Sequence, residues 1–275
     1  MRFIQSRRNP LVRSMRALHN NKVRRSRRRF LVEGVRLLEE ALASECIVDT
    51  VLYCIETTID GRMQALLNRL QDSGVSVIAA TQAVVDSVSE TESPPGLTAV
   101  VRCPPTPELT AVVGSTDLLV LGDQIQDPGN AGTIIRTAEA AGAGGTFFSA
   151  GSVYPFSDKV IRASMGSLFR LPVEVLSDGG QELCNLCINS GWQLVFAVPD
   201  EGVPWWNVDF KRPTLLVLGN EGSGISGDVL ALKGSKVSIP LAPQVESLNV
   251  AIAGAVLLFE TVRQRTSCKE KSIML

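Results

Sequence analysis

The sequence contains a single histidine, and this scarcity limits the chemistry that the chain can perform. Its six cysteines are scattered, and only Cys184 and Cys187 form a C-x-x-C pair, inside a predicted helix. A zinc site needs four ligands at paired spacing, and the sequence has no second pair to complete one. We therefore predict no metal site, and we expect the cysteines to be buried free thiols in a reducing compartment.

Long hydrophobic runs are also missing. The longest strongly apolar stretch, residues 250–259, has ten residues, whereas a membrane-spanning helix needs about 20. The arginines near the N-terminus are not followed by the apolar segment of a secretory leader. We therefore predict a cytoplasmic protein that has no membrane segment.

Two common nucleotide-binding motifs are incomplete. Gly222, Gly224 and Gly227 have the spacing of the dinucleotide fingerprint, but neither a full crossover helix nor an acid at the end of a next strand follows. Gly219 and Gly224 have the spacing of a P-loop, but Ile225 stands where that loop needs lysine. The glycines therefore predict neither a nicotinamide cofactor nor a nucleoside triphosphate.

The net charge is only −1, but it is unevenly distributed. Residues 1–36 contain twelve Arg or Lys and one acid, Glu33, so this segment carries +11 and the remainder −12. Apolar residues recur among these arginines at helix-like intervals. The pattern favours a surface that meets a polyanion, and a solvated, poorly ordered arm is the alternative.

The apolar pattern predicts two α/β domains. Three prolines in residues 103–107 stop both helix and strand, so we predict a first domain over 1–103, a linker over 104–115, a second domain over 116–266 and a tail over 267–275. In the first domain, helices are predicted at 9–20, 34–44, 61–73 and 81–89, and strands at 30–32, 47–55, 75–79 and 97–101.

In the second domain, six predicted strands alternate with helices, which indicates a mostly parallel sheet covered on both faces. The strands are predicted at 118–121, 146–149, 173–176, 193–198, 215–218 and 237–241, and the helices at 131–141, 158–167, 181–190, 226–232 and 248–265. The last helix is apolar nearly all round, so we expect it to be buried or to form an oligomer interface.

Polar and glycine residues gather where strands of this sheet end. Gly219 to Gly222 follow one predicted strand, and Ser247 to Asn249 follow the next. Ligands bind at the carboxyl ends of strands in such sheets, so we expect one site here. After the first strand, Asn130 is predicted at or near a helix N-cap and Arg136 in the second helical turn; a cap and an ion pair would also explain each residue alone.

Together these segments resemble a known family. Residues 126–142 (QDPGNAGTIIRTAEAAG), 216–226 (LVLGNEGSGIS) and 238–260 (SIPLAPQVESLNVAIAGAVLLFE) resemble, in order, the three motifs of the SpoU/TrmH family of RNA ribose 2′-O-methyltransferases, in the SPOUT superfamily. Residues 4–11 (IQSRRNPL) and 30–34 (FLVEG) resemble the N-terminal substrate-binding domain of its rRNA-directed branch.

The resemblance implies an α/β fold whose C-terminal domain contains a deep trefoil knot, with a smaller N-terminal α/β substrate-binding domain. It also implies that S-adenosyl-L-methionine binds in the knot, held largely by backbone groups, and that the protein is a homodimer. The positions that match the family's cofactor site are Leu218, Gly219, Gly222, Ile239 and Leu248.

The family assigns the role of general base to the arginine of the first motif, here Arg136. A guanidinium normally stays protonated and has no acceptor, so the alternative is that Arg136 stabilises the developing alkoxide or holds a phosphate. The matched polar positions are Asn130, Glu221, Ser247 and Asn249. We expect Asn130 and Asn249 to fix loops and substrate, Glu221 to orient Arg136 or bind backbone amides, and Ser247 to contact the 2′-hydroxyl.

The implied activity is methylation of a ribose 2′-hydroxyl in RNA, most simply 23S-type rRNA. A tRNA 2′-O-methyltransferase and a non-catalytic RNA-binding or ribosome-assembly protein are the alternatives. Phosphate contacts are predicted from basic residues of the N-terminal arm and of the segment around residue 160. They are Arg7, Arg8, Arg24, Arg25, Arg27, Arg28, Lys159 and Arg162.

Overall fold

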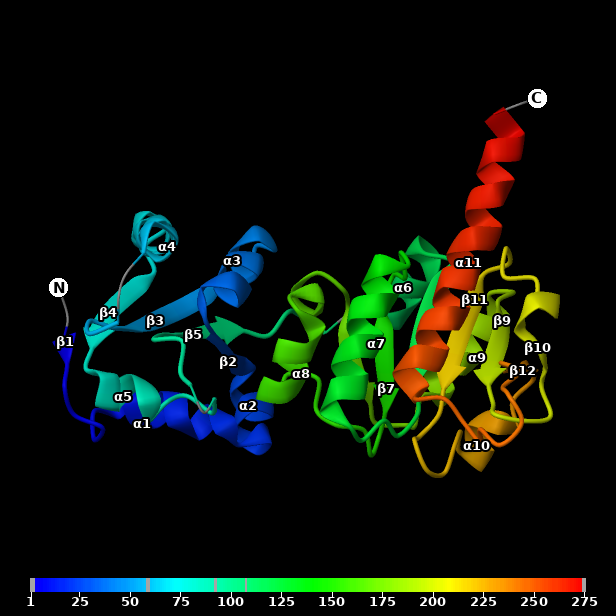
Figure 1. The fold of residues 1–275 in the computed structure, drawn as a ribbon, viewed down its shortest axis with the longest axis horizontal. Coiled ribbons are helices and arrows are strands. Elements are labelled where there is room, and N and C mark those ends of the chain that lie inside the picture. Colours follow the sequence, from blue (N-terminus) through cyan, green and yellow to red (C-terminus); the bar gives the residue numbers. More distant parts are fainter. Residues whose placement is uncertain (1–2, 58–59, 92, 107, 274–275) are drawn as a thin grey trace. The chain divides into compact units, whose positions relative to one another are not determined.

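The computed structural model describes residues 3–57, 60–91, 93–106 and 108–273, and for residues 267–273 it describes the backbone alone. The chain divides into two compact units (Figure 1). Unit 1 comprises Met1–Pro105 and Phe156–Arg170, and unit 2 comprises Thr106–Pro155 and Leu171–Leu275. Within the described residues, no helix combines the length and hydropathy that a bilayer crossing requires.

Unit 1 is built on a five-stranded mixed sheet with the order β1-β4-β3-β5-β2. Its strands are β1 (Phe3–Ile4), β2 (Arg29–Glu33), β3 (Val48–Cys54), β4 (Ser76–Ala80) and β5 (Leu97–Arg102). Strand β5 runs antiparallel to β2 and β3, whereas β4 pairs in parallel with β1 and β3. The four strands predicted from the apolar pattern are confirmed, and β1 is an addition.

Helices cover both faces of this sheet (Figure 1). On one face, Val12, Met15 and Leu18 pack with Leu52 and Ile78 of the sheet. The helices of unit 1 are α1 (Pro10–Arg16), the 3₁₀ turn η1 (Ala17–His19), α2 (Asn21–Arg27), α3 (Val35–Ala43), α4 (Gly61–Asp72), α5 (Gln82–Asp86), α8 (Asp158–Ser164) and the 3₁₀ turn η2 (Ser167–Phe169). Asn20 caps α2 by accepting from the Lys22 N–H, so the predicted single helix over 9–20 is followed by a second helix made from the basic run.

Residues 156–170 belong to unit 1, although the sequence-based boundaries placed them in the second domain. The rings of Phe156 and Phe169 contact the buried ring of Phe30, with centroids 5.3 and 6.0 Å away. The Arg170 guanidinium also pairs with Glu40 at 2.6 Å. These contacts join positions more than 120 residues apart, so no local pattern in the sequence could indicate them.

Unit 2 contains a seven-stranded sheet with the order β10-β12-β9-β11-β6-β7-β8, and all of its strand pairs are parallel. The strands are β6 (Leu118–Gly122), β7 (Thr146–Ser149), β8 (Val173–Leu176), β9 (Gln193–Ala197), β10 (Val203–Pro204), β11 (Thr214–Leu218) and β12 (Ser235–Ser238). The predicted parallel sheet is confirmed, with β10 added and β12 beginning and ending earlier than expected.

The helices of unit 2 are α6 (Leu109–Ser115), α7 (Pro128–Ala140), α9 (Gln181–Asn189), the 3₁₀ turn η3 (Trp205–Asn207), α10 (Gly227–Leu230) and α11 (Val250–Ile273). Val112 of α6 and Cys184 of α9 pack on Leu121 and Val217 of the sheet. Helix α6 therefore lies within residues expected to form a linker. Helices α7 and α11 pack together, and α11 extends through the predicted tail to Ile273.

The cysteine pair lies inside this core. Cys184 and Cys187 are buried, and both are free thiols. Burial is the main reason why the pKa of each thiol is raised to about 12, so neither is a thiolate near neutral pH. The interpretation of the C-x-x-C pair as buried free thiols is confirmed.

The route of the chain past β11 positions the candidate site. Strand β11 lies between β9 and β6. The chain then crosses to β12, on the other side of β9, and returns to pack α11 against α7. Two loops consequently meet at one end of the sheet, one after β11 and one after β12. The threading of these loops into a knot stays a prediction.

Candidate active site

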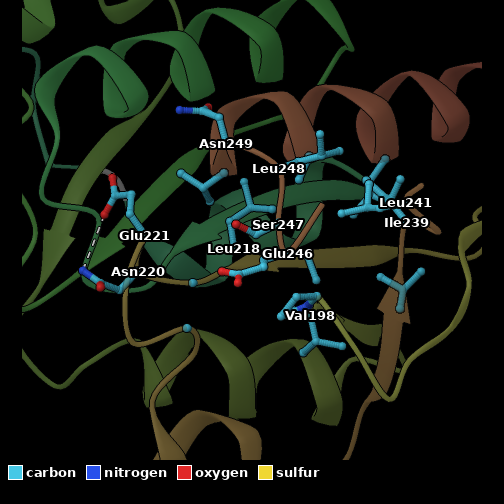
Figure 2. A pocket seen from close by; sticks show the side chains of 18 of the residues that line it. Val198, Leu218, Asn220, Glu221, Ile239, Leu241, Glu246, Ser247, Leu248 and Asn249 are labelled. Atoms are coloured by element: carbon cyan, nitrogen blue, oxygen red, sulfur yellow. Dashed lines mark hydrogen bonds between the residues drawn. The ribbon is translucent and has the colours of Figure 1, made fainter. Parts of the chain in front are cut away.

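A cavity of about 510 Å³ lies at the carboxyl ends of β9, β11 and β12 (Figure 2). Leu218 and Ala197 end β11 and β9 in register, and Val237, next to the last residue of β12, also pairs with Ala197, so the loops that follow meet there. The cavity is lined by residues 197–199, 218–222, 224, 237, 239, 241 and 246–250, with Ala253 and Leu257 of α11. All five residues predicted to bind a cofactor are among them.

Gly219 makes the loop after β11 possible. A Cβ atom at this position would lie 2.4 Å from the Gly224 carbonyl carbon and the Ile225 nitrogen, both of them backbone atoms. The loop folds back on itself here, and the backbones of Asn220 and Gly224 exchange hydrogen bonds of 2.9 and 3.1 Å. Gly224 has a φ of +71°, a conformation that glycine adopts without strain.

Asn220 fixes this loop from inside, although the sequence analysis gave it no role. Its Oδ1 accepts from the backbone N–H groups of Gly222 and Ser223, both at 2.9 Å, and its Nδ2 donates to the Gln124 carbonyl at 2.7 Å. An asparagine followed by a glycine two positions later is a signal for such a turn. Asn220 therefore ties the loop after β11 to the loop after β6.

Glu221 connects the first two motifs. Its carboxylate accepts from Asn130 Nδ2 at 2.8 Å and from the backbone N–H groups of Gln126 and Asp127 at 3.4 and 3.3 Å. Burial acts to raise the pKa of Glu221, but these donors outweigh it and lower the pKa below its ordinary value. Glu221 is therefore ionised at neutral pH and binds backbone amides, one of the two roles expected for it.

The third motif joins through Asn130. Because Glu221 can only accept, Asn130 presents its Nδ2 to Glu221 and turns its Oδ1 to Asn249, whose Nδ2 donates at 2.8 Å. Asn249 Oδ1 in turn accepts from the Ala251 N–H at 2.9 Å, at the start of α11. The three predicted polar residues Asn130, Glu221 and Asn249 thus form one chain of hydrogen bonds.

The N-cap of α7 is Asp127 rather than Asn130. The Asp127 side chain accepts from the Asn130 N–H at 2.8 Å, and Pro128 occupies the first helical turn. Asn130 therefore lies inside the first turn, and its side chain is free to bridge Glu221 and Asn249. Asp and Asn both cap helices well, so the sequence alone could not separate them.

Asp123 is a further residue that the sequence analysis missed. It is 1% exposed, and it accepts from Ser149 Oγ at 2.6 Å and from the Ser226 N–H at 2.7 Å. These bonds tie the ends of β6 and β7 to the residues just before α10. An acid directly after a buried strand was the available signal, because a buried carboxylate requires donors around it.

The other two predicted catalytic residues are placed differently. Ser247 is exposed and lines the cavity, on the loop before α11 (Figure 2). Arg136 is exposed on α7 and is not among the residues that line the cavity. In the described part of the chain, no hydrogen bond or ion pair occupies its guanidinium.

Comparison with known proteins identifies this arrangement. Residues 117–259 match the SpoU rRNA Methylase family, and residues 9–99 match the MRM3-like substrate binding domain. The chain belongs to the SpoU rRNA methylase family. The family resemblance of the three motifs is thereby confirmed, and the substrate-binding match falls in unit 1, whereas the methylase match covers most of unit 2 and residues 156–170 of unit 1.

Two 23S rRNA methyltransferases resemble this chain along nearly its whole length. The 23S rRNA (guanosine(2553)-2′-O)-methyltransferase RlmP of Bacillus subtilis is 33% identical over 94% of this chain and 98% of its own. The 23S rRNA (uridine(2479)-2′-O)-methyltransferase of Streptomyces viridochromogenes is 34% identical over 94% of this chain and 92% of its own.

Solved structures of SpoU methylases confirm the fold class. The methyltransferase AviRb of Streptomyces viridochromogenes in complex with AdoMet superposes with a TM-score of 0.85 and 34% identity, covering 94% of this chain and 99% of its own. The AdoMet-bound rRNA methyltransferase of Sinorhizobium meliloti superposes with a TM-score of 0.84 and 29% identity, covering 95% of this chain and 97% of its own. The expected SPOUT-type α/β domain preceded by a smaller α/β domain is therefore correct.

The cavity of this SpoU methylase fits S-adenosylmethionine. Its volume lies within the roughly 300 to 1,000 Å³ of small-molecule sites, and Leu218, Ile239 and Leu257 give it apolar walls. The absence of a side chain at Gly219 leaves the backbone of the loop accessible, which suits recognition by N–H and C=O groups. This donor set agrees with the backbone recognition expected for the family.

The predicted RNA-binding residues lie in unit 1. Most are exposed, namely Arg7, Arg8, Arg25, Arg27, Arg28 and Lys159, and Arg162 is half-buried. Arg24 is the exception, because it is 1% exposed and its guanidinium pairs with Asp158 inside the unit. Arg24 therefore does not contact RNA from this position, and its prediction as an RNA ligand is corrected.

Two glycines that follow β11 allow a matched test. Gly219→Ala is expected to weaken S-adenosylmethionine binding at least tenfold, because its Cβ would displace the backbone of residues 224 and 225. Gly227→Ala is the control, since Gly227 does not line the cavity and, outside its own helix and its chain neighbours, no atom of the described residues lies within 4 Å of its Cβ position, and cofactor affinity should stay within a few-fold. Calorimetric titration measures both, and equal affinities for the two variants would contradict the role of Gly219.

Proposed function

We propose that this chain transfers a methyl group from S-adenosylmethionine to a ribose 2′-hydroxyl of large-subunit, 23S-type rRNA. The observation that carries the proposal is the cavity at the ends of β9, β11 and β12, where Glu221, Asn130 and Asn249 hold the three motifs together. The end-to-end similarity to 23S rRNA 2′-O-methyltransferases supports the same substrate class.

Leu218, Gly219, Gly222, Ile239 and Leu248 would hold the cofactor, since all five line the cavity. When bound, S-adenosylmethionine supplies a methyl group on a sulfonium centre. The residues of the chain do the rest: they bind the cofactor, place the ribose hydroxyl beside the cavity, and provide for the departure of the proton.

Glu221 is a poor candidate for the general base. Its carboxylate already accepts hydrogen bonds from Asn130 and two backbone N–H groups, and its pKa is lowered by these donors. A low pKa reduces the affinity of the group for a proton. We assign Glu221 to holding the loops, and Ser247 and Asn249, which line the cavity, to contacts with the ribose.

Arg136 has the properties of an anion-binding residue. Its side chain is exposed, and within the described residues no acid pairs with it. A protonated guanidinium can stabilise a developing alkoxide or hold the adjacent phosphate with two parallel hydrogen bonds. We assign Arg136 this role, with the proton leaving to water or to another group.

Exposed apolar side chains of unit 2 support the predicted homodimer. Ile252 and Phe259 on α11 are 52% and 51% exposed, and Val245 in the loop before α11 is 50% exposed. Ile252 and Phe259 are seven positions apart and therefore share one face of α11, and exposed apolar side chains on one helix face are typical of an oligomer interface. We infer that a second copy of the chain covers this face. We also propose that the enzyme acts in the cytoplasm on ribosomal RNA.

The comparisons favour rRNA over tRNA as the substrate. The rRNA methyltransferases cited above match both units of this chain. A tRNA modifying enzyme of Aquifex aeolicus, TrmH/SpoU, covers 60% of this chain with a TM-score of 0.50. We therefore propose that unit 1 serves rRNA recognition, with Arg8, Arg25 and their exposed basic neighbours contacting phosphates.

Incubation with labelled S-adenosylmethionine tests the proposal. The purified protein is given 23S rRNA, 16S rRNA and tRNA from cells that lack it, and the label is mapped by nuclease digestion. Label on the 2′-oxygen of one 23S nucleotide is the expected result. Label confined to tRNA would favour a tRNA enzyme, and cofactor binding without any label would favour a non-catalytic RNA-binding protein.

Replacement of Arg136 separates chemistry from cofactor binding. Arg136→Ala should reduce methyl transfer by at least two orders of magnitude, because the charge that stabilises the transition state is lost. Cofactor affinity should stay within a few-fold, since Arg136 does not line the cavity. Single-turnover assays and calorimetry measure the two quantities, and a large loss of cofactor affinity would show that Arg136 belongs to a different site.

Salt dependence tests the basic arm. Replacing Arg8 and Arg25 together by Ala should reduce the slope of log affinity against log salt by roughly 0.7 to 0.9 for each lost phosphate contact. Helix α4 lies over the other face of the sheet (Figure 1), and its Arg62 and Arg69 are also exposed. Their double replacement by Ala changes the net charge equally, and it should leave the slope of rRNA binding unchanged. If the Arg8/Arg25 and Arg62/Arg69 replacements reduced the slope equally, a specific role of Arg8 and Arg25 in RNA binding would be contradicted.

A further inference from the structure

Unit 1 contains a buried charge cluster that the proposed chemistry does not use. Arg24 on α2 is 1% exposed and Asp158, the first residue of α8, is 6% exposed. The Arg24 guanidinium pairs with Asp158 Oδ2 and donates to Asn21 Oδ1 at 2.9 Å. A buried arginine requires such a partner, because removing either charge would leave the other uncompensated.

His19 extends the cluster. Its Nε2 lies 2.8 Å from the Val88 carbonyl oxygen, and its Nδ1 lies 3.0 Å from Glu90 Oε1 and 3.5 Å from Asp158 Oδ2. The Val88 carbonyl and the ionised Asp158 carboxylate can only accept hydrogen bonds, so the two ring nitrogens satisfy both only when His19 is protonated. The geometry therefore selects the imidazolium.

The four side chains come from separate segments. His19 and Arg24 belong to the N-terminal helices, Glu90 follows α5, and Asp158 begins α8. The Glu90 backbone is itself held, since its N–H donates to Glu33 Oε1 at 3.2 Å. The residue after Asp158 is the exposed Lys159, so the cluster fixes the helix that carries two of the predicted phosphate contacts, Lys159 and Arg162.

We propose that Arg24, His19, Glu90 and Asp158 form a charge lock that holds residues 156–170 on unit 1, with Asp158 positioning Lys159 and Arg162 for RNA. The part that concerns RNA rests on the proposed function. The lock itself does not, because it is a property of unit 1 alone. In this proposal Arg24 stabilises unit 1, whereas the sequence predicted that it contacts RNA phosphates.

The lock depends on pH through His19. Burial acts to lower the pKa of His19, but Asp158 and Glu90 outweigh burial and raise it above its ordinary value of 6.5. Burial and the charge of Asp158 raise the pKa of Glu90. The charged groups that face His19 are Asp158 and Glu90, and the Arg24 guanidinium lies nearby. Because the pKa of His19 is raised, the lock is complete below about pH 6.5, and the contribution of His19 is lost as the pH rises through its folded-state pKa.

A divalent cation is the competing occupant of the cluster. His19, Glu90 and Asp158 present ligand atoms that lie within 4.8 Å of one another. The Arg24 guanidinium already pairs with Asp158 and brings a positive charge to the same place. That charge repels a cation, so the arrangement favours the lock over a metal site.

The single histidine makes the test clear. In the full-length protein, the one imidazole resonance reports the pKa of His19 directly. Asp158→Asn should lower this pKa, and it should speed amide exchange in residues 156–170 at least tenfold. Glu39→Gln, which removes an exposed ion pair with Arg62 in the same unit, is the control and should change neither. An unchanged His19 pKa or unchanged exchange in Asp158→Asn would overturn the lock.

Two further measurements keep the lock testable if Asp158→Asn does not fold or if the proposed function is wrong. In the wild-type protein, amide exchange of residues 156–170, corrected for its intrinsic pH dependence, should rise between pH 6 and 9, and it should not do so in His19→Gln. Affinity for 23S rRNA should fall at least fivefold in Asp158→Asn while cofactor affinity is unchanged. If the wild-type protein has no affinity for rRNA at any pH, the positioning of Lys159 and Arg162 for RNA is refuted, but the lock is not. Stabilisation by Zn²⁺ that requires Asp158 would identify a metal site and overturn the lock.

Discussion

The candidate site depends on the carboxylate of Glu221. It accepts hydrogen bonds from Asn130 and from the backbone of Gln126 and Asp127. Asn130 in turn accepts a hydrogen bond from Asn249. Each bond alone is worth about 1 kcal/mol, or somewhat more where the acceptor is charged. Their importance lies in what they join: the loops after β6, β11 and β12, which no strand pairing holds together. Together with the bonds of Asn220 and Asp123, this chain of bonds fixes the cavity walls relative to one another.

The same loops explain why the site is built from glycine and amide groups. Gly219 approaches the backbone of Gly224 too closely for any side chain, and Asn220 caps the turn with bonds to Gly222 and Ser223. A loop held by its own backbone leaves N–H and C=O groups in fixed positions along the cavity. That arrangement recognises a small cofactor by its shape and hydrogen-bonding edges rather than by a charged partner.

Local patterns in the sequence were enough to predict most helices and all strands except β1 and β10, and the family resemblance supplied the three motif segments. Buried parallel strands read as short apolar runs that end in glycine or polar residues, and both signals are local. The contacts that depend on the tertiary structure were not accessible in this way. Phe156 and Phe169 join Phe30 across the chain, and Arg24 is withdrawn from the surface by Asp158, 134 residues away. Arginine in a basic run indicates an exposed charge unless its partner is known, and that partner lay in the other half of the sequence.

The most direct test of this account is the affinity of Glu221→Gln for S-adenosylmethionine. Glutamine has nearly the same shape, but its amide would present a donor to groups that already donate, so the bonds to residues 126, 127 and 130 cannot all form. Glu246→Gln is the matched control, because Glu246 also lines the cavity. The account predicts that cofactor affinity falls about tenfold in Glu221→Gln, the cost of losing a charged acceptor, and changes little in the control. Equal affinities in Glu221→Gln and the wild-type protein would contradict it.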